Sequence, residues 1–168
     1  ITIVDAQSAP TVTLAAASSS VGEDGSNVTV TATASSATYE DITVSLSTSG
    51  TATDDTDYAL DDTITISAGS TSGTATFNPT SDSHYDATSN ESATIAISGV
   101  SGGSATESGT QTTSITIVDA ESAPTISIAT DQTTRSETDS DATLTATLTT
   151  EVKSEKTPSP VKCLALIL

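Results

Sequence analysis

The stretch "TITISAGSTSGTATF", residues 63–77, alternates small polar with apolar residues on both sides of a Gly- and Ser-rich turn. Such alternation is typical of strands with one buried face, and Thr, Ile and Phe favour strands over helices. The pattern predicts strands at 63–67 and 73–77. It recurs at 11–16, 26–34, 42–48, 92–98 and 112–118, each segment bounded by Gly, Ser, Asp, Asn or Pro.

The number and spacing of these segments predict the fold class. Seven short strands within about 110 residues, with no helical period, are typical of a seven-stranded antiparallel β-sandwich of immunoglobulin type. Only 34% of the 168 residues are apolar and 2% are aromatic. The sequence therefore predicts an all-β domain with a thin core of Val, Ile, Leu, Ala and Thr methyl groups.

A long internal repeat sets the domain organisation. "ITIVDAQSAP" at 1–10 returns as "ITIVDAESAP" at 115–124, and residues 1–15 match 115–129 at 11 of 15 positions. The offset of 114 residues continues downstream, where Glu23 falls on Glu137. A fixed period of domain size indicates a tandem array. We predict the end of one repeat and a linker at 1–9, a complete domain at 10–121, and the truncated start of the next repeat at 122–150.

The last segment, 151–168, differs in composition from the repeats. It contains all three lysines and Cys163, which is the single cysteine, so no disulfide is expected to support the fold. Its apolar run "CLALIL" is too short to span a bilayer, and no signal peptide is visible. We predict that 151–168 is an unrelated, disordered tail and that 122–168 does not form a second stable sandwich.

The charge of the chain excludes several classes of partner. Acidic residues outnumber basic ones 22 to 4, which gives a net charge of −18, and residues 1–134 contain no Lys or Arg. Such a surface repels nucleic acid and anionic lipid. We therefore expect no nucleic-acid partner and no direct insertion into a membrane.

The acidic residues are distributed unevenly. If successive strands run antiparallel, the loops after strands one, three and five and the exit of strand seven lie at one end of the sandwich, here called the acidic end. Of the 15 acids between residues 6 and 121, 12 are predicted at this end: Glu23, Asp24, Asp54, Asp55, Asp57, Asp61, Asp62, Asp82, Asp86, Glu91, Asp119 and Glu121. Three, namely Glu40, Asp41 and Glu107, are predicted at the opposite end. A surface that served solubility alone would not be so one-sided.

Crowded carboxylates require a neutralising partner, because each raises the pKa of the others and costs stability. A hard cation fits, since several loop oxygens suit Ca²⁺ better than Mg²⁺, which demands a tighter octahedron. Zinc is disfavoured, because residues 10–121 contain no Cys and a single His, His84. The sequence therefore predicts Ca²⁺ as the bound ion.

Several phrases together resemble one known family. "SVGEDGSNVTVTATAS" (20–35), "SGTATDDTDYALDDTITISAGSTSGTATF" (49–77), "NESATIAISGV" (90–100) and "SITIVDAES" (114–122) are similar to the Calx-beta domain. The resemblance covers residues 10–119, with 124–150 as the start of a second copy. That family is known from the regulatory region of sodium–calcium exchangers, from integrin-associated proteins and from bacterial surface proteins.

The resemblance implies a set of calcium ligands. These are Glu23 after the first strand, Asp57 of the "DY" pair, Asp82, Asp86 and Glu91 in the loop after the fifth strand, and Asp119 and Glu121 at the exit of the last strand. The sequence departs from the family pattern in three ways. Asp86 replaces a glutamate, the gap to Glu91 is two residues longer, and Ala120 interrupts an acidic run. These departures predict one or two ions rather than a fuller cluster.

No catalytic site is expected. "GVSGG" at 99–103 fits the G-x-S-x-G pattern, but that chemistry needs a strand-to-helix turn and a histidine later in the chain, whereas His84 precedes it. Tyr58 is expected to pack its ring at the acidic end and anchor Asp57 rather than bind a ligand. The sequence thus predicts a non-enzymatic domain.

Together these features predict a calcium-binding structural repeat that stiffens an extracellular or cell-surface, adhesin-like tandem array. The expected partners are calcium ions, neighbouring repeats joined head to tail, and a cell-surface or matrix ligand of the full-length protein. Two alternatives remain open: a regulatory calcium sensor of a membrane transporter, and an accessory module of a secreted enzyme. A transmembrane segment or a catalytic domain elsewhere in the full-length gene would distinguish them.

Overall fold

The computed structural model describes residues 8–82, 85, 90–134, 136–138 and 140–148. The described residues fall into two compact units: 8–82 and 90–120 form the first, and Tyr85 with the described residues from Glu121 onward forms the second. They contain strands and turns and no helix. No helix among them is long and apolar enough to cross a membrane.

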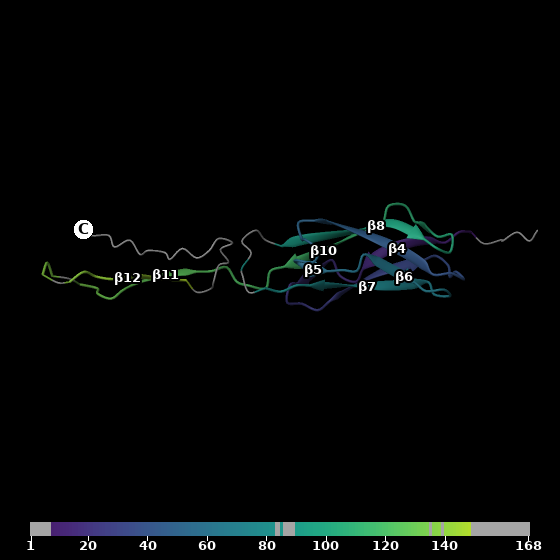
Figure 1. Cartoon of the computed structure of the whole chain (residues 1–168). Coiled ribbons are helices and arrows are strands. Elements are labelled where there is room, and N and C mark those ends of the chain that lie inside the picture. Colours follow the sequence, from purple (N-terminus) through teal and green to yellow (C-terminus); the bar gives the residue numbers. More distant parts are fainter. Residues whose placement is uncertain (1–7, 83–84, 86–89, 135, 139, 149–168) are drawn as a thin grey trace, which may run out of the picture. The chain divides into compact units, whose positions relative to one another are not determined.

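The first unit is a sandwich of two five-stranded sheets (Figure 1). Its seven long strands are β1 (Thr11–Ala16), β3 (Val28–Ala34), β4 (Ile42–Gly50), β6 (Thr63–Ile66), β7 (Ser72–Pro79), β8 (Glu91–Ser101) and β10 (Thr112–Val118). These coincide with the seven predicted strands to within a few residues. The all-β, immunoglobulin-like fold class is therefore confirmed.

Three short strands complete the sheets and were missed by the sequence analysis. They are β2 (Ser20–Gly22), β5 (Tyr58–Ala59) and β9 (Thr106–Glu107). One sheet has the order β5-β7-β3-β1-β9, and the other has the order β2-β10-β8-β4-β6. The chain therefore changes sheets between β1 and β2: β1 lies between β3 and β9 in one sheet, and β2 is an edge strand of the other.

The core lies between the two sheets and consists of the inward-facing positions of the long strands. Val12, Val30, Val44, Ile95 and Ile115 are fully buried. Each lies in a segment that alternates buried with more exposed positions, as one-sided burial requires. No polar or charged residue is buried among the described ones, so the core is formed by apolar side chains.

One glycine is required where β4 ends and the chain enters the acidic end. Gly50 has a φ of 126°, a conformation that side chains rarely adopt, and it pairs with Ala93 of β8. A Cβ at this position would overlap the carbonyl oxygen of Ser92. That carbonyl accepts hydrogen bonds from the backbone N–H groups of Thr51 (2.9 Å) and Ala52 (3.1 Å). The close approach thus fixes where the loop after β4 begins.

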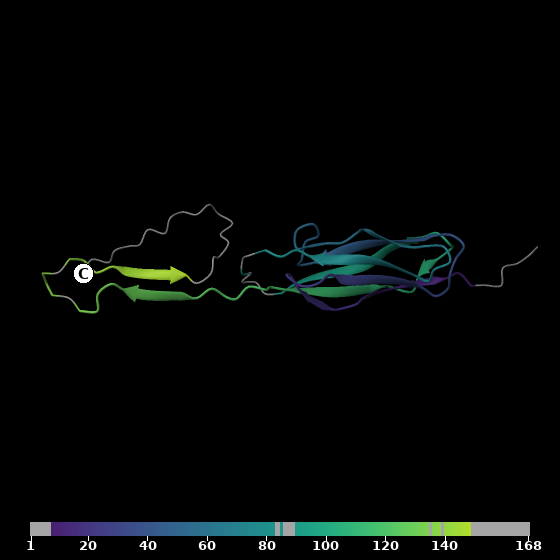
Figure 2. The ribbon, with the colours of Figure 1, turned by 90° about the horizontal axis from the view of Figure 1, so that it is seen from below.

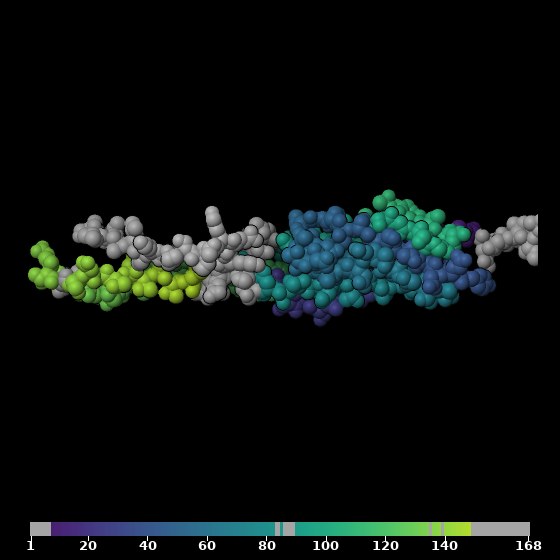
Figure 3. All heavy atoms as spheres, in the orientation of Figure 1, coloured from purple at the N-terminus to yellow at the C-terminus, as the bar shows by residue number. Residues whose placement is uncertain are grey.

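The second unit contains one antiparallel hairpin, formed by β11 (Ile126–Thr130) and β12 (Leu144–Leu148), which Figure 2 shows in green and yellow-green. All ten strand residues are exposed. In Figure 3 the atoms of this hairpin form a thin band, whereas those of the sandwich form a thick body. Residues 122–148 thus provide a sheet of two strands, and no second layer occurs among the described residues of that range.

Candidate metal centre at the acidic end

The short strand β2 positions Glu23. Parallel pairing of β2 with β10 sets Ser20, Val21 and Gly22 opposite Thr116, Ile117 and Val118. The backbone N–H of Glu23 then donates to the carbonyl of Val118 at 3.0 Å. Because parallel strands leave a sheet at the same end, Glu23 and the residues that follow Val118 emerge side by side.

Three carboxylates converge at this point and are here called the acidic triad. Glu23, Asp119 and Glu121 each offer one carboxylate oxygen, and these oxygens all lie within 4.8 Å of one another. All three residues are half-buried. Asp119 follows β10 directly, and Glu121 lies two residues further on. Three of the seven predicted ligands are thus brought together by the pairing of β2 with β10.

The carboxylate of Asp57 organises its own loop. Its Oδ2 accepts a hydrogen bond from the backbone N–H of Thr53 at 2.6 Å, and its backbone carbonyl accepts one from Thr80 at 2.9 Å. Asp55, in the same loop, has a left-handed φ of 63°. Aspartate tolerates this conformation better than most residues. Asp57 therefore ties the loop after β4 to the end of β7, and its part in metal binding stays a prediction.

The other predicted ligands lie in or beside the loop after β7. Glu91 is the first residue of β8, pairs with Ile117 of β10 and is half-buried. Asp82 is exposed. Asp86 lies outside the described residues, as does His84. The structure thus places Glu91 beside the strand that leads to Asp119, and it leaves the roles of Asp82 and Asp86 as predictions.

The predicted uneven distribution of acids needs one correction. Asp61 and Asp62 were assigned to the acidic end, but the carbonyl of Asp62 accepts a hydrogen bond from Leu46, and β6 begins opposite Ser45, in the middle of β4. The loop from β5 to β6 therefore crosses the side of the sandwich. The prediction from strand count placed each whole loop at one end of the sandwich. It is wrong for this loop because β6 is shorter than β4 and pairs only with its first half.

The acids of the opposite end serve local structure. Asp41 Oδ1 accepts a hydrogen bond from the backbone N–H of Ala68 at 2.8 Å. Glu107 Oε1 accepts one from Gln111 at 2.6 Å. These carboxylates cap turns between strands, whereas the acidic triad gathers side chains from two separate segments.

Tyr58 packs as the sequence predicted. The residue is 1% exposed, and its ring stacks on Phe77 with the ring centroids 4.5 Å apart and the planes at 19°. Burial raises the pKa of its phenol, the carboxylates of Asp54 and Asp57 raise it further, and Thr48 offsets part of the rise. The ring closes the core directly below the loop that contains Asp57 and is not available to a ligand.

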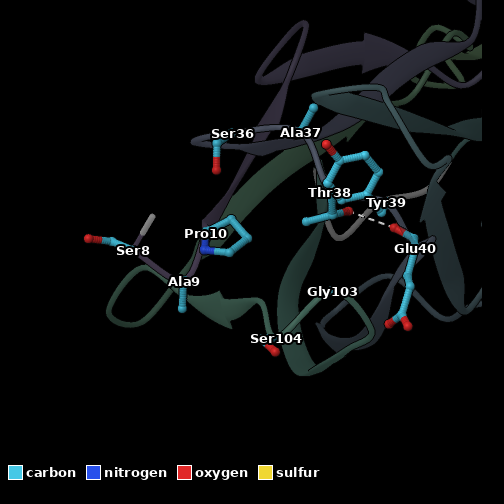
Figure 4. Close-up of a pocket in the computed structure, with 10 residues that line it drawn as sticks. All are labelled: Ser8, Ala9, Pro10, Ser36, Ala37, Thr38, Tyr39, Glu40, Gly103 and Ser104. Carbon is cyan, nitrogen blue, oxygen red and sulfur yellow. Dashed lines mark hydrogen bonds between the residues drawn. The ribbon is translucent and has the colours of Figure 1, made fainter. Parts of the chain in front are cut away.

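A hollow on the sandwich lies at the opposite end, near the start of β1 (Figure 4). Its volume is about 480 Å³, and its lining includes Pro10, Thr38, Tyr39, Glu40 and Ser104. Thr38 donates a hydrogen bond to the carbonyl of Glu40, and Tyr39 is fully exposed. The lining contains one carboxylate, that of Glu40.

Three solved structures are similar to the sandwich in fold. The apo form of the Calx CBD1 domain aligns with a TM-score of 0.53 and 16% identity over 66% of this chain and 99% of that one. The CBD12 structures of CALX1.2 and CALX1.1, the latter titled a calcium binding domain, each align with a TM-score of 0.50 at 17% and 18% identity. This chain spans 41% and 42% of those two structures, which align with 60% of it. The sandwich therefore has a Calx-beta-like fold.

Neither a family model nor a curated protein matches the sequence. Low identity means that the likeness concerns the course of the backbone.

Proposed function

We propose that residues 10–121 bind Ca²⁺ at the acidic end and that the ion stiffens a structural repeat of an extracellular, adhesin-like protein. The observation that carries this proposal is the convergence of the acidic triad on the β2–β10 pair. Three carboxylates this close repel one another. A divalent cation bound between them would offset this repulsion.

The chemistry of the donors favours calcium over other ions. All three donors are carboxylate oxygens, and no Cys occurs in residues 1–134, so a soft metal has no preferred ligand. Calcium takes 6–8 oxygens in a flexible arrangement, of which the triad offers part, and carbonyl groups, water and Asp57 or Glu91 could supply the rest. Bound calcium would link the end of β2 to the end of β10.

The place of Glu121 suggests what this link achieves. Glu121 is followed by "SAP" at 122–124, the predicted linker between repeats, and its proline restricts the backbone. An ion held by Glu23 and Glu121 would fix the exit of the sandwich where one repeat joins the next. Strong acidity and tandem repetition suit an exposed stalk, so we propose a location at the cell surface or outside the cell.

The test is thermal unfolding of the full chain in Ca²⁺ and in chelator at constant ionic strength, followed by circular dichroism. An ion that binds the folded protein alone stabilises it by about 2.7 kcal/mol at 100 times its dissociation constant. We expect a higher midpoint in Ca²⁺ than in chelator and a much smaller rise in equimolar Mg²⁺. Equal midpoints in Ca²⁺ and chelator would refute the proposal.

Charge-matched variants separate a defined site from diffuse screening. Asp119→Asn is expected to remove most of the calcium response while leaving the midpoint in chelator unchanged or raised, because it also relieves repulsion within the triad. Glu40→Gln removes the same charge at the opposite end and should retain the full response. If both variants weaken the response equally, calcium acts by screening the net charge and the triad is not its site.

A further inference from the structure

The hollow near the start of β1, here called the Tyr39 hollow, has walls from three separate segments. They are the stretch before β1, the loop from β3 to β4 and the turn from β8 to β9, which contribute residues from 8–10, 36–40 and 103–104. Figure 4 shows Pro10 on one side of the hollow and Tyr39 on the other. Its volume of about 480 Å³ lies within the range of small-molecule sites.

Backbone hydrogen bonds hold these walls in place. The N–H of Thr106 donates to the carbonyl of Pro10 at 3.0 Å, and the N–H of Gly69 donates to the carbonyl of Thr38 at 2.8 Å. A Cβ at Gly103 would lie 2.7 Å from the side chain of Thr38, so the turn and the loop are in direct contact. The hollow is thus formed before any ligand arrives, which spares a ligand the cost of ordering its walls.

The described lining is rich in hydroxyl groups and contains no basic side chain. The hydroxyl groups belong to Ser8, Ser36, Thr38, Tyr39 and Ser104. Each hydroxyl group can both donate and accept hydrogen bonds. An anionic ligand would meet no positive charge in this lining, and the net charge of −18 would repel it. The ligand that fits is therefore neutral or cationic and carries several hydrogen-bonding groups.

Tyr39 adds an apolar surface beside these hydroxyl groups. Its side chain is fully exposed, and it is the single large hydrophobic residue exposed in the described part of the sandwich. Pro10 and Ala37 add further apolar groups to the lining. Covering an exposed aromatic ring with an apolar surface removes both from water and is favourable. A ligand for the Tyr39 hollow thus needs an apolar face and polar groups around it.

We propose that the Tyr39 hollow binds a neutral saccharide, with one face of a sugar ring packed on the ring of Tyr39. A sugar ring combines the two required features, because the C–H groups on one face are apolar and the hydroxyl groups at its edge donate and accept hydrogen bonds. The carboxylate of Glu40 accepts hydrogen bonds at both oxygens, so it can bind two neighbouring sugar hydroxyl groups. The hollow is separate from the acidic triad, and this binding is independent of calcium.

A cationic ligand is the main rival, because Tyr39 and Glu40 can together hold an ammonium group. The position of the hollow argues against this rival. The described lining has one carboxylate, whereas the acidic triad alone brings three together at the acidic end. A cation is therefore attracted more strongly to the acidic end than to the Tyr39 hollow. The hydroxyl groups, which outnumber the carboxylate, suit a neutral ligand.

NMR titration of the isotope-labelled full chain tests the proposal. The probes are neutral hexasaccharides of glucose, mannose, galactose and N-acetylglucosamine. We expect at least one of them to shift the amide signals of residues 38–40 and Ser104, with a dissociation constant of about 1 mM or lower. If none of the probes shifts these signals at about 10 mM, the proposal is wrong.

Variants of Tyr39 test the packing of the sugar ring. Tyr39→Ala removes the aromatic ring from an exposed loop position and should weaken binding by roughly tenfold or more. Tyr39→Phe keeps the ring and should recover most of the binding. Equal binding by the parent and by Tyr39→Ala would overturn the proposal.

Glu40→Gln and Asp119→Asn form a matched pair that separates this site from the proposed calcium site, because each removes one charge. Glu40→Gln should weaken saccharide binding by roughly fivefold and keep the calcium response. Asp119→Asn should lose the calcium response and keep saccharide binding. Equal weakening of saccharide binding in both variants would contradict the proposal. If trilysine shifts the signals of residues 38–40 at a concentration where no saccharide does, the ligand is cationic and the proposal fails.

Discussion

The β1–β3 pair of the sandwich and the β11–β12 hairpin are the same structural element in two surroundings. Every residue pair in β11–β12 lies 114 positions after its counterpart in β1–β3: Val12 faces Ala34 as Ile126 faces Leu148. The hydrogen bond from Ala17 to the carbonyl of Thr29 (2.9 Å) also returns, from Asp131 to Thr143 (3.2 Å). Register is thus reproduced whether or not a second layer is present.

Burial, by contrast, differs completely between the two elements. Leu14 is 7% exposed and its counterpart Ile128 is 67% exposed. The short strand β2 differs too, because Thr134 and Ser136, the counterparts of Ser20 and Gly22, lie outside any strand. β2 pairs with β10, and the described part of the second unit has no counterpart of β10. Local sequence therefore sets the pairing of neighbouring strands, whereas the core and the acidic triad require the complete sandwich.

The largest expected effect tests this contrast in stability. Leu14→Ala leaves a cavity between the two sheets, and we expect a loss of about 2–5 kcal/mol in the free energy of unfolding of the sandwich. Ile128→Ala, at the equivalent position, should change that value by less than about 0.5 kcal/mol. Urea unfolding of both variants, followed by circular dichroism, measures the difference. Similar losses in the two would mean that the hairpin face contributes to the core of the sandwich.

A smaller effect tests the same contrast at the metal centre. Glu23 and Glu137 occupy equivalent positions, but Glu23 alone has Asp119 and Glu121 beside it. Glu23→Gln should remove most of the calcium-induced stabilisation, up to about 2.7 kcal/mol at 100 times the dissociation constant, and Glu137→Gln should remove none of it. Calorimetric titration of the two variants with Ca²⁺ gives the comparison. A loss of heat in Glu137→Gln would place an ion in the second unit.

The sequence predicted the seven long strands because each carries its own alternation and its own turn residues. It could not predict β2, β5 and β9, which are two or three residues long and are held by partners distant in the sequence. In β2 only Val21 is a large apolar residue, and one such residue does not predict a strand. The pairing of this strand with β10 nevertheless places Glu23 beside Asp119. The sequence thus predicted that these three carboxylates lie at the same end of the sandwich, but it did not predict the β2–β10 pairing that brings them together.

Asp62 shows where strand parity failed, and Asp57 shows what strand parity leaves open. Strand parity predicted the end at which a loop lies, but it says nothing about which carboxylates are used by their own loop. Asp57 bonds to Thr53 within four residues, and the loop that holds Asp62 runs along the side of the sandwich because β6 starts late. Both outcomes depend on strand lengths and loop geometry, which alternation does not encode.

The smallest expected effect concerns Tyr58, whose burial also requires the complete sandwich. Its pKa is raised in the folded protein, first by burial and then by Asp54 and Asp57, so the folded state keeps the phenolic proton to higher pH than the unfolded state does. The stability linked to this proton is therefore intact below the model-peptide value of about 10 and is lost as the pH rises toward the raised pKa, by at most about 1.4 kcal/mol per pH unit. Tyr58→Phe keeps the ring stacked on Phe77 but has no proton to lose, so its stability should fall less between pH 9 and about 11 than that of the parent.

Tyr39→Phe, at a fully exposed position, is the matched control and should follow the parent. Urea unfolding at each pH gives the three curves, and a Tyr58→Phe curve parallel to the parent would show that the phenol titrates alike in the folded and unfolded chain.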